Sequence, residues 1–214
     1  MYRLLVADDH PLFREAMVAV IARGLSGSET LEAASLAAAL EVVAQHDDLD
    51  LALLDLGLPD AEGLSGLAQL RQAVPWLPVV IVSAEQHKHT ILEALNLGAV
   101  GYIPKSTPRD TLLVALQQIL AGQVYLPPDI MRTSSPPSST PSPSEHHPLA
   151  SLTDKQREVL AHMVKGESNK MIAYRLDIAE TTVKTHVSAI LRKLRVSSRV
   201  QAILLASERD DGTR

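Results

Sequence analysis

Residues 4–11, LLVADDHP, place two adjacent carboxylates directly after four apolar residues. The apolar run predicts a buried strand, and Asp8 and Asp9 follow where that strand ends. Neighbouring carboxylates repel each other and lose hydration when they are buried, so they need a compensating cation. The rest of the chain should therefore supply groups that share this strand end.

Five predicted strands alternate with five predicted helices over residues 1–122. We expect the strands at 2–7, 29–33, 51–54, 79–83 and 100–104, and the helices at 12–23, 36–45, 64–73, 90–97 and 110–121. Three of the strands are continuously apolar, which is typical of a parallel sheet covered on both faces. The predicted fold class is α/β, with a five-stranded, doubly wound parallel sheet.

Polar residues follow the strands at one edge of this predicted sheet, where such folds bind ligands. Asp55 follows the third strand, Ser83 ends the fourth and Lys105 follows the fifth. Together with Asp8 and Asp9 they predict a single site. Carboxylates suit Mg²⁺, and a lysine with a hydroxyl suits a phosphoryl group.

The motifs that carry these residues are VADDHP, LLDLGLP, VVIVSA and GAVGYIPKS. With them, residues 1–122 resemble the flavodoxin-like receiver domain of two-component response regulators. The resemblance implies that Asp55 accepts a phosphoryl group, which Lys105 and Ser83 contact. It implies a Mg²⁺ site made by Asp8, Asp9, Asp55 and the carbonyl of Gly57, and a switch residue at Tyr102. Gly57 also allows a close approach of main chain to a metal.

Charge and composition divide the chain into two domains and a tether. Residues 1–150 carry 8 Lys/Arg against 17 Asp/Glu, whereas residues 151–214 carry 12 against 8. Between the halves, TSSPPSSTPSPSEHHP at 133–148 has five prolines and six serines. This composition predicts an extended, flexible linker, which we assign to residues 123–150.

Residues 151–208 predict a small all-α domain of four short helices. Thr153, with Gln156 three positions later, predicts a capping box, and Ser168 predicts the N-cap of the next helix. A tight turn then leads to a third helix at 181–194, a pattern typical of helix-turn-helix. One side of that helix is apolar; its other side is polar and predicted to be open to a partner, with Lys184, Thr185, Ser188 and Arg192.

The stretches LTDKQREVL, GESNKMIAYRL, TVKTHVSAILRKL and SSRVQAI make this domain resemble the LuxR-type helix-turn-helix. With the receiver in front, the chain resembles regulators of the NarL/FixJ class. The resemblance implies that Lys184, Thr185 and Ser188 face the major groove. It implies phosphate contacts from Asn169, Lys170, Thr181, Thr182, His186 and Arg192. The last helix, with Val200, Ile203 and Leu204 on one side, is the predicted surface of a homodimer on double-stranded DNA.

These features predict a phosphorylation-gated transcription factor whose phosphate comes from a sensor histidine kinase. Without phosphate, the receiver is expected to mask the helix-turn-helix or keep the chain monomeric. An enzyme is not expected: a Mg²⁺-dependent aspartyl-phosphate phosphatase needs D-x-D where this chain has DDH and DLG. An RNA-binding or protein-interaction output stays an alternative. The absence of cysteine and of a long apolar run predicts a cytoplasmic protein without membrane contact.

Overall fold

The computed structural model describes residues 2–127, 148–196 and 199–207. Most of the predicted linker, and the end of the predicted DNA-binding domain at residue 208, therefore lie outside the described residues. Five strands form one parallel sheet in the order β2-β1-β3-β4-β5. Their bounds are β1 Arg3–Ala7, β2 Glu29–Ala33, β3 Leu51–Leu54, β4 Val79–Ser83 and β5 Gly101–Pro104. The predicted fold class is confirmed, and the predicted strands differ from these by at most one residue.

Five helices cover the two faces of the sheet. They are α1 Pro11–Gly24, α2 Leu36–Gln45, α3 Ser65–Ala73, α4 Lys88–Asn96 and α5 Arg109–Leu120. One apolar cluster packs α2, α3 and α4 on one face, and a second packs α1 and α5 on the other. Since both faces are covered, β3 and β4 are buried along their whole length, as their continuous apolar sequences require.

The segment after α5 continues to pack against the sheet. The N–H of Tyr102 donates to the carbonyl of Tyr125 at 3.0 Å, and Tyr125 forms an isolated bridge with Gly101. Leu126 packs against the apolar cluster on the α2–α4 face. Residues at the start of the predicted linker thus belong to the packed structure of the first domain.

The second domain contains η1 Pro148–Ser151, α7 Asp154–Val164, α8 Asn169–Leu176, α9 Glu180–Leu194 and α10 Arg199–Ser207. The capping box predicted at α7 is present, because Thr153 Oγ1 accepts from the N–H of Gln156 and Gln156 Oε1 accepts from the N–H of Thr153. Ser168 caps α8 through the N–H of Met171. The apolar face of α9 is buried in the core, as its spacing predicts.

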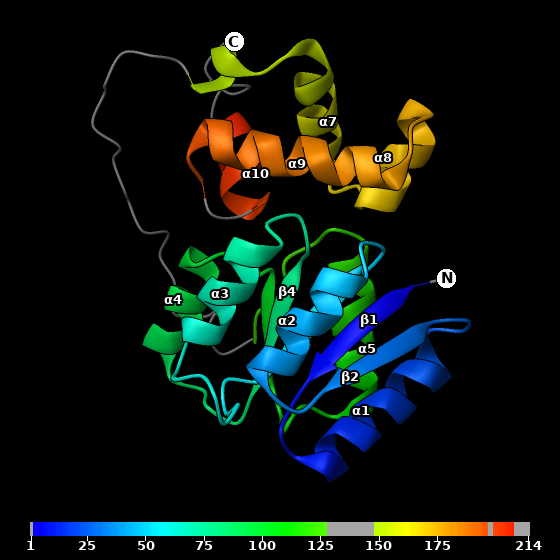
Figure 1. The fold of residues 1–214 in the computed structure, drawn as a ribbon, viewed down its shortest axis with the longest axis vertical. Coiled ribbons are helices and arrows are strands. Elements are labelled where there is room, and N and C mark those ends of the chain that lie inside the picture. The colour runs from blue at the N-terminus through cyan, green and yellow to red at the C-terminus, as the bar shows by residue number, and fades with distance from the viewer. Residues whose placement is uncertain (1, 128–147, 197–198, 208–214) are drawn as a thin grey trace.

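The helical domain lies against the edge of the sheet at which the strands begin, and α9 runs across that edge (Figure 1). The two domains also approach each other closely at two glycines. A Cβ placed on Gly122, after α5, would lie 2.2 Å from the carbonyl oxygen of Gly166, after α7. The carboxyl ends of the strands, and the residues predicted to take a phosphoryl group, are therefore at the far edge of the sheet.

Candidate functional site

The acidic cluster forms because β1 and β3 are neighbours that end at the same level. Ala7 pairs with Leu54, and the next residues along the two strands are Asp8 and Asp55. The N–H of Asp55 donates to the carbonyl of Ala7 at 2.9 Å, which fixes the backbone at the end of β3. Asp8 is 2% exposed and Asp55 is 5% exposed. The sheet register thus holds two carboxylates side by side at the rim of the core.

Lys105 supplies the cation that these carboxylates need. Its backbone N–H donates to the carbonyl of Ser83, which positions it after β5. Its Nζ lies 2.7 Å from Asp8 Oδ2 and 2.7 Å from Asp55 Oδ2. Burial on its own would lower the pKa of Lys105, but the hydrogen bonds to Asp55 and Asp8 outweigh burial and raise that pKa. The lysine stays charged and neutralises part of the acidic cluster.

Asp9 and His10 complete the cluster. One carboxylate oxygen each from Asp8, Asp9 and Asp55, and one ring nitrogen of His10, all lie within 4.8 Å of one another. His10 Nδ1 is 2.6 Å from Asp9 Oδ1. The sequence did not indicate a role for His10, because a single histidine beside two aspartates is common in exposed loops; only the fold shows that it joins this group.

The donor set fits a hard divalent cation. Mg²⁺ prefers carboxylate and carbonyl oxygens and keeps several waters, so it needs only a few protein ligands. A Cβ on Gly57 would lie 3.2 Å from Asp55 Oδ2, which shows how closely the main chain approaches the carboxylate there. A side chain at position 57 would crowd the space beside Asp55.

Ser83 lies on β4, the neighbour of β3, and Tyr102 lies on β5, the neighbour of β4. Ser83 ends β4 and is 5% exposed, and its Oγ accepts from the N–H of Glu85 at 3.2 Å. Tyr102 is fully buried, and its hydroxyl donates to the carbonyl of Glu85 at 2.7 Å. Burial raises the pKa of Tyr102. Both side chains therefore hold the main chain at Glu85, between the end of β4 and α4.

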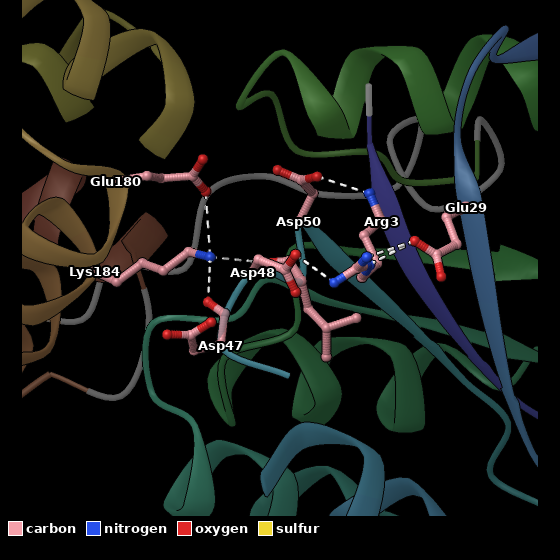
Figure 2. A network of polar contacts seen from close by, with 8 residues as sticks. Arg3, Glu29, Asp47, Asp48, Asp50, Glu180 and Lys184 are labelled. Atoms are coloured by element: carbon pink, nitrogen blue, oxygen red, sulfur yellow. Dashed lines mark hydrogen bonds and ion pairs between the residues drawn. The ribbon is translucent and has the colours of Figure 1, made fainter. Parts of the chain in front are cut away.

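The polar side of α9, predicted to be open, is closed at Lys184, which faces the first domain, whereas Thr185 and Arg192 on the same side are exposed. Lys184 is 4% exposed. Its Nζ donates to the carbonyls of Asp47 at 2.6 Å and Leu49 at 3.3 Å, and lies 3.2 Å from Glu180 Oε1 (Figure 2). The same Nζ lies 4.3 Å from the centre of the Trp76 ring. Periodicity correctly assigned Lys184 to the polar face, but could not show that another domain covers it.

The remaining predicted base contacts border the same region. A space of about 390 Å³ lies beside this contact, and its lining includes Thr181, Thr185, Ser188 and Arg192. The Thr185 hydroxyl donates to the carbonyl of Thr181, and that of Ser188 to the carbonyl of Lys184. Both side chains are thus engaged within α9.

The predicted phosphate contacts differ in accessibility. Thr181, Thr182 and Arg192 are exposed and His186 is partly exposed. Asn169 is 9% exposed, and its Oδ1 accepts from Arg199 Nη1 at 3.1 Å. Lys170 lies over the ring of Tyr2 in the first domain, at 5.5 Å. The structure does not bring these residues together on one open surface.

The predicted dimer residues also face the first domain. Val200, Ile203 and Leu204 line a cleft of about 380 Å³ between α10 and the strand-starting edge of the sheet. Leu204 is 58% exposed. Lys184, predicted to read DNA, and the residues predicted to contact a second copy are thus turned toward the same edge of the first domain.

Comparisons with known proteins match both domains. The model of the response regulator receiver domain matches residues 4–117, and that of the bacterial regulatory proteins of the luxR family matches residues 150–206. The glycerol metabolism activator of Pseudomonas putida is 58% identical over 98% of this chain and 97% of its own length. The nitrate/nitrite response regulator protein NarL of Escherichia coli K12 is 34% identical over 93% of this chain and 92% of its own.

The chain is also similar to solved structures of response regulators. A LuxR-family two-component response regulator from Aurantimonas sp. SI85-9A1 is 31% identical, with a TM-score of 0.56 over 61% of this chain and 92% of its own. Salmonella typhimurium RcsB, at 18% identity, shares the fold over 97% of this chain and 100% of its own, with a TM-score of 0.58. Within the described ranges, none of the helices has both the length and the apolar character needed to cross a membrane.

Proposed function

Because the chain belongs to the two-component response regulators with a LuxR-type helix-turn-helix, we propose that phosphorylation of Asp55 controls its binding to DNA. The observation that carries the proposal is the burial of Lys184 against the first domain. A lysine that reads a base edge has to reach the major groove, and here its Nζ is bound to main-chain carbonyls instead. The described arrangement is a closed state that cannot bind DNA through Lys184.

The proposed chemistry is the transfer of a phosphoryl group from the phosphohistidine of a sensor histidine kinase. A carboxylate oxygen of Asp55 attacks phosphorus, the P–N bond breaks, and an acyl phosphate forms. Such a transfer depends mainly on positioning and on neutralising the equatorial oxygens. Lys105 Nζ already lies 2.7 Å from Asp55 Oδ2 and can move its contact to the phosphoryl oxygens. Ser83, at the end of β4, would donate a hydrogen bond to the same phosphoryl group.

Mg²⁺ is the cofactor that this site would use. Asp8, Asp9 and Asp55, with the carbonyl of Gly57, would hold it, and it would neutralise charge shared by the carboxylates and the phosphoryl oxygens. A side chain at position 57 would bring its Cβ within 3.2 Å of Asp55 Oδ2, so the glycine there supports this assignment. The chain's own contribution is to hold Asp8 and Asp55 in adjacent register and to keep both largely out of water.

Ser83 and Tyr102 are proposed to transmit the effect of phosphorylation from Asp55 to the neighbouring backbone. A phosphoryl group on Asp55 would attract the Ser83 hydroxyl, which now accepts from the N–H of Glu85. Glu85 is also held by Tyr102, so a shift of Ser83 changes both contacts of that residue. The segment from Glu85 to α4 is thus the first part of the backbone to be affected.

Opening the domains would release two surfaces together. The side of α9 that carries Lys184 would reach DNA, and Val200, Ile203 and Leu204 would become available to a second copy. A two-fold dimer would then read half-sites about 34 Å apart. Since the Pseudomonas putida relative described above is named an activator, we propose that the open dimer raises transcription, acting in the cytoplasm where DNA and kinase meet.

The test measures affinity for duplex DNA with and without a small phosphodonor and Mg²⁺. We expect the phosphodonor to lower the Kd of the wild type by about tenfold, within the usual range of coupling energies of about 1–3 kcal/mol. Asp55→Asn should show no response, whereas Asp110→Asn, an exposed aspartate of α5, should respond like the wild type. Equal affinities of the wild type in both conditions would refute the control by phosphorylation.

The same titrations distinguish DNA from RNA as the partner. For duplex DNA we expect log Kd to rise steeply with log salt, since each phosphate contact releases a counterion. RNA of the same length should bind more weakly at every salt concentration. Tighter binding to RNA would favour the alternative output.

A further inference from the structure

Arg14, on the first turn of α1, contacts the backbone that leads into the acidic pair. Its Nη1 donates to the carbonyl of Asp8 at 2.8 Å, and its Nε donates to Glu32 Oε2 at 2.9 Å. Glu32 lies on β2, the strand that pairs with β1. The guanidinium therefore joins the start of α1, the end of β1 and the neighbouring strand β2.

Asp8 and Asp9 differ in how the protein holds their carboxylates. Asp8 Oδ1 accepts from the N–H of His10 at 2.8 Å, and Asp8 Oδ2 lies 2.7 Å from Lys105 Nζ. Asp9 lies between the end of β1 and the start of α1, and its Oδ1 is buried without a hydrogen-bond partner among the described residues. His10 Nδ1 lies 2.6 Å from this oxygen, but not in the geometry of a hydrogen bond. Only one of the two carboxylates is thus fixed by hydrogen bonds of its own.

The direction of Asp9 therefore depends on its backbone. A buried carboxylate oxygen without a partner is unfavourable, and turning the side chain toward water would relieve it. Because a peptide unit is planar, holding the carbonyl of Asp8 fixes the plane that leads into Asp9. Arg14 holds this carbonyl, and the ion pair with Glu32 holds Arg14 in turn. The contact keeps Asp9 from rotating freely about the end of β1.

We propose that Arg14 is a positioning residue that keeps the carboxylate of Asp9 directed into the Mg²⁺ site. It acts through the main chain of Asp8 and is not itself a ligand of the metal. Groups behind metal ligands typically change metal affinity by about 10- to 100-fold when they are removed. This inference rests on the Mg²⁺ site of the proposed function, but does not depend on the control of DNA binding.

The charge of Arg14 and its positioning role predict opposite effects of a substitution. If its charge alone mattered, removing a cation near the site would tighten the binding of Mg²⁺, because two positive charges repel each other. If Arg14 positions Asp9, the same substitution weakens the binding of Mg²⁺. The sign of the change in Kd therefore distinguishes the two roles.

The first test is titration calorimetry of Mg²⁺ with the full-length, unphosphorylated protein. Arg14→Gln should raise the Kd for Mg²⁺ about tenfold. Arg23→Gln removes an exposed arginine near the other end of α1 and should leave this Kd unchanged. A Kd that falls or stays the same in Arg14→Gln would overturn the proposal, and so would an equal rise in both variants.

Arg14→Lys tests the geometry of the contact at constant charge. A lysine has one nitrogen in place of the planar fork that contacts Asp8 and Glu32 together. Its Kd for Mg²⁺ should lie between those of the wild type and Arg14→Gln, and it replaces Arg14→Gln if that variant does not fold. A Kd equal to that of the wild type would overturn the proposal.

A second measurement separates positioning of Asp9 from general damage to the site. With a small phosphodonor, Arg14→Gln should need about tenfold more Mg²⁺ for half-maximal phosphorylation, in line with its weaker binding of the metal. At saturating Mg²⁺ it should reach the same extent of phosphorylation as the wild type. A loss that Mg²⁺ does not restore would show that the substitution disturbs Asp55 as well, and would contradict the proposal.

The outcomes also separate this inference from the proposed function. If Arg14→Gln binds Mg²⁺ more weakly but phosphorylation leaves the DNA affinity of the wild type unchanged, the control of DNA binding fails and the role of Arg14 stands. If phosphorylation lowers the Kd for DNA but Arg14→Gln binds Mg²⁺ like the wild type, the role of Arg14 alone is refuted. A wild type that binds no Mg²⁺ would refute both the proposed cofactor and the role of Arg14.

Discussion

Two lysines lie at opposite edges of the same parallel sheet, and their partners differ in kind. Lys105 contacts two carboxylates that come from the ends of β1 and β3. Lys184 contacts two main-chain carbonyls just before β3, the carboxylate of Glu180 in its own helix and the ring of Trp76. A phosphoryl group on Asp55 changes the charge around Lys105 directly, whereas Lys184 loses its contacts with the first domain only when the domains move apart.

The difference shows what phosphorylation has to accomplish. No charge near Lys184 changes when Asp55 is modified, so the modification acts only through its different free energy of interaction with the closed and open arrangements. The short strand β3 links the two edges, with Asp47 and Leu49 before it and Asp55 after it. Substitutions at the Lys105 edge should therefore alter folding and phosphorylation, and substitutions at the Lys184 edge should alter the arrangement of the domains.

The largest effect is expected from Lys105→Ala. Its loss leaves the buried carboxylates of Asp8 and Asp55 facing each other without a cation. Breaking a buried ion pair from one side costs about 3 kcal/mol, and we expect the free energy of unfolding to fall by that amount in urea denaturation. Mg²⁺ should restore part of the loss, because a divalent cation replaces the missing charge. Lys155→Ala, at an exposed pair on α7, is the control; a loss no larger than in that control would contradict the role of Lys105.

Lys184→Ala should weaken two interactions: the binding of the phosphorylated protein to DNA, and the contact between the two domains in the unphosphorylated protein. Removing a lysine that contacts a base costs about 1–3 kcal/mol, so the Kd of the phosphorylated protein should rise by roughly 5- to 150-fold. Trp76 is the only tryptophan of the chain, and its fluorescence should change in the unphosphorylated variant because the lysine leaves its ring. Lys155→Ala again serves as the control. Weaker DNA binding without a change in fluorescence would mean that the closed state does not depend on Lys184.

Gly122→Ala should open the domains without touching either lysine. The added Cβ would collide with the carbonyl of Gly166, and that carbonyl is backbone and cannot move alone. Since Gly122 also has a φ of +91°, Ala is strained there, and Gly27→Ala at a φ of +75° is the control with the same strain and open space around it. We expect the Kd of the unphosphorylated protein for duplex DNA to fall about fivefold in Gly122→Ala only. An equal change of this Kd in Gly122→Ala and Gly27→Ala would show that backbone strain, rather than the collision with Gly166, causes the change.

The same contrast explains what the sequence could predict. Asp8, Asp55 and Lys105 each follow a strand, and neighbouring parallel strands place such residues at one edge, so periodicity was enough to bring them together. The partners of Lys184 are carbonyls, which every residue has, and a tryptophan from a loop 108 positions earlier in the chain. Asp60 likewise accepts from the N–H groups of Leu36 and Ala37 at the start of α2, from a distant loop. Contacts of these kinds form only when complete helices, strands and loops pack against one another, so a local sequence pattern does not predict them.

The smallest effect concerns the loop that supplies the carbonyls to Lys184. The hydrogen bond from Arg3 holds the pKa of Asp48 below its ordinary value of 3.8 (Figure 2). Because the pKa is lower in the folded protein, the stabilisation is present above the unfolded pKa and is lost as pH falls through the folded pKa. The side chain of Asp48 is 54% exposed, so the amount is a few tenths of a kcal/mol. Urea denaturation of Asp48→Asn should give a lower free energy of unfolding than the wild type at pH 6, and the difference should vanish in strong acid. A difference for Asp48→Asn that stays constant with pH would show that the loop is held by packing rather than by its charge.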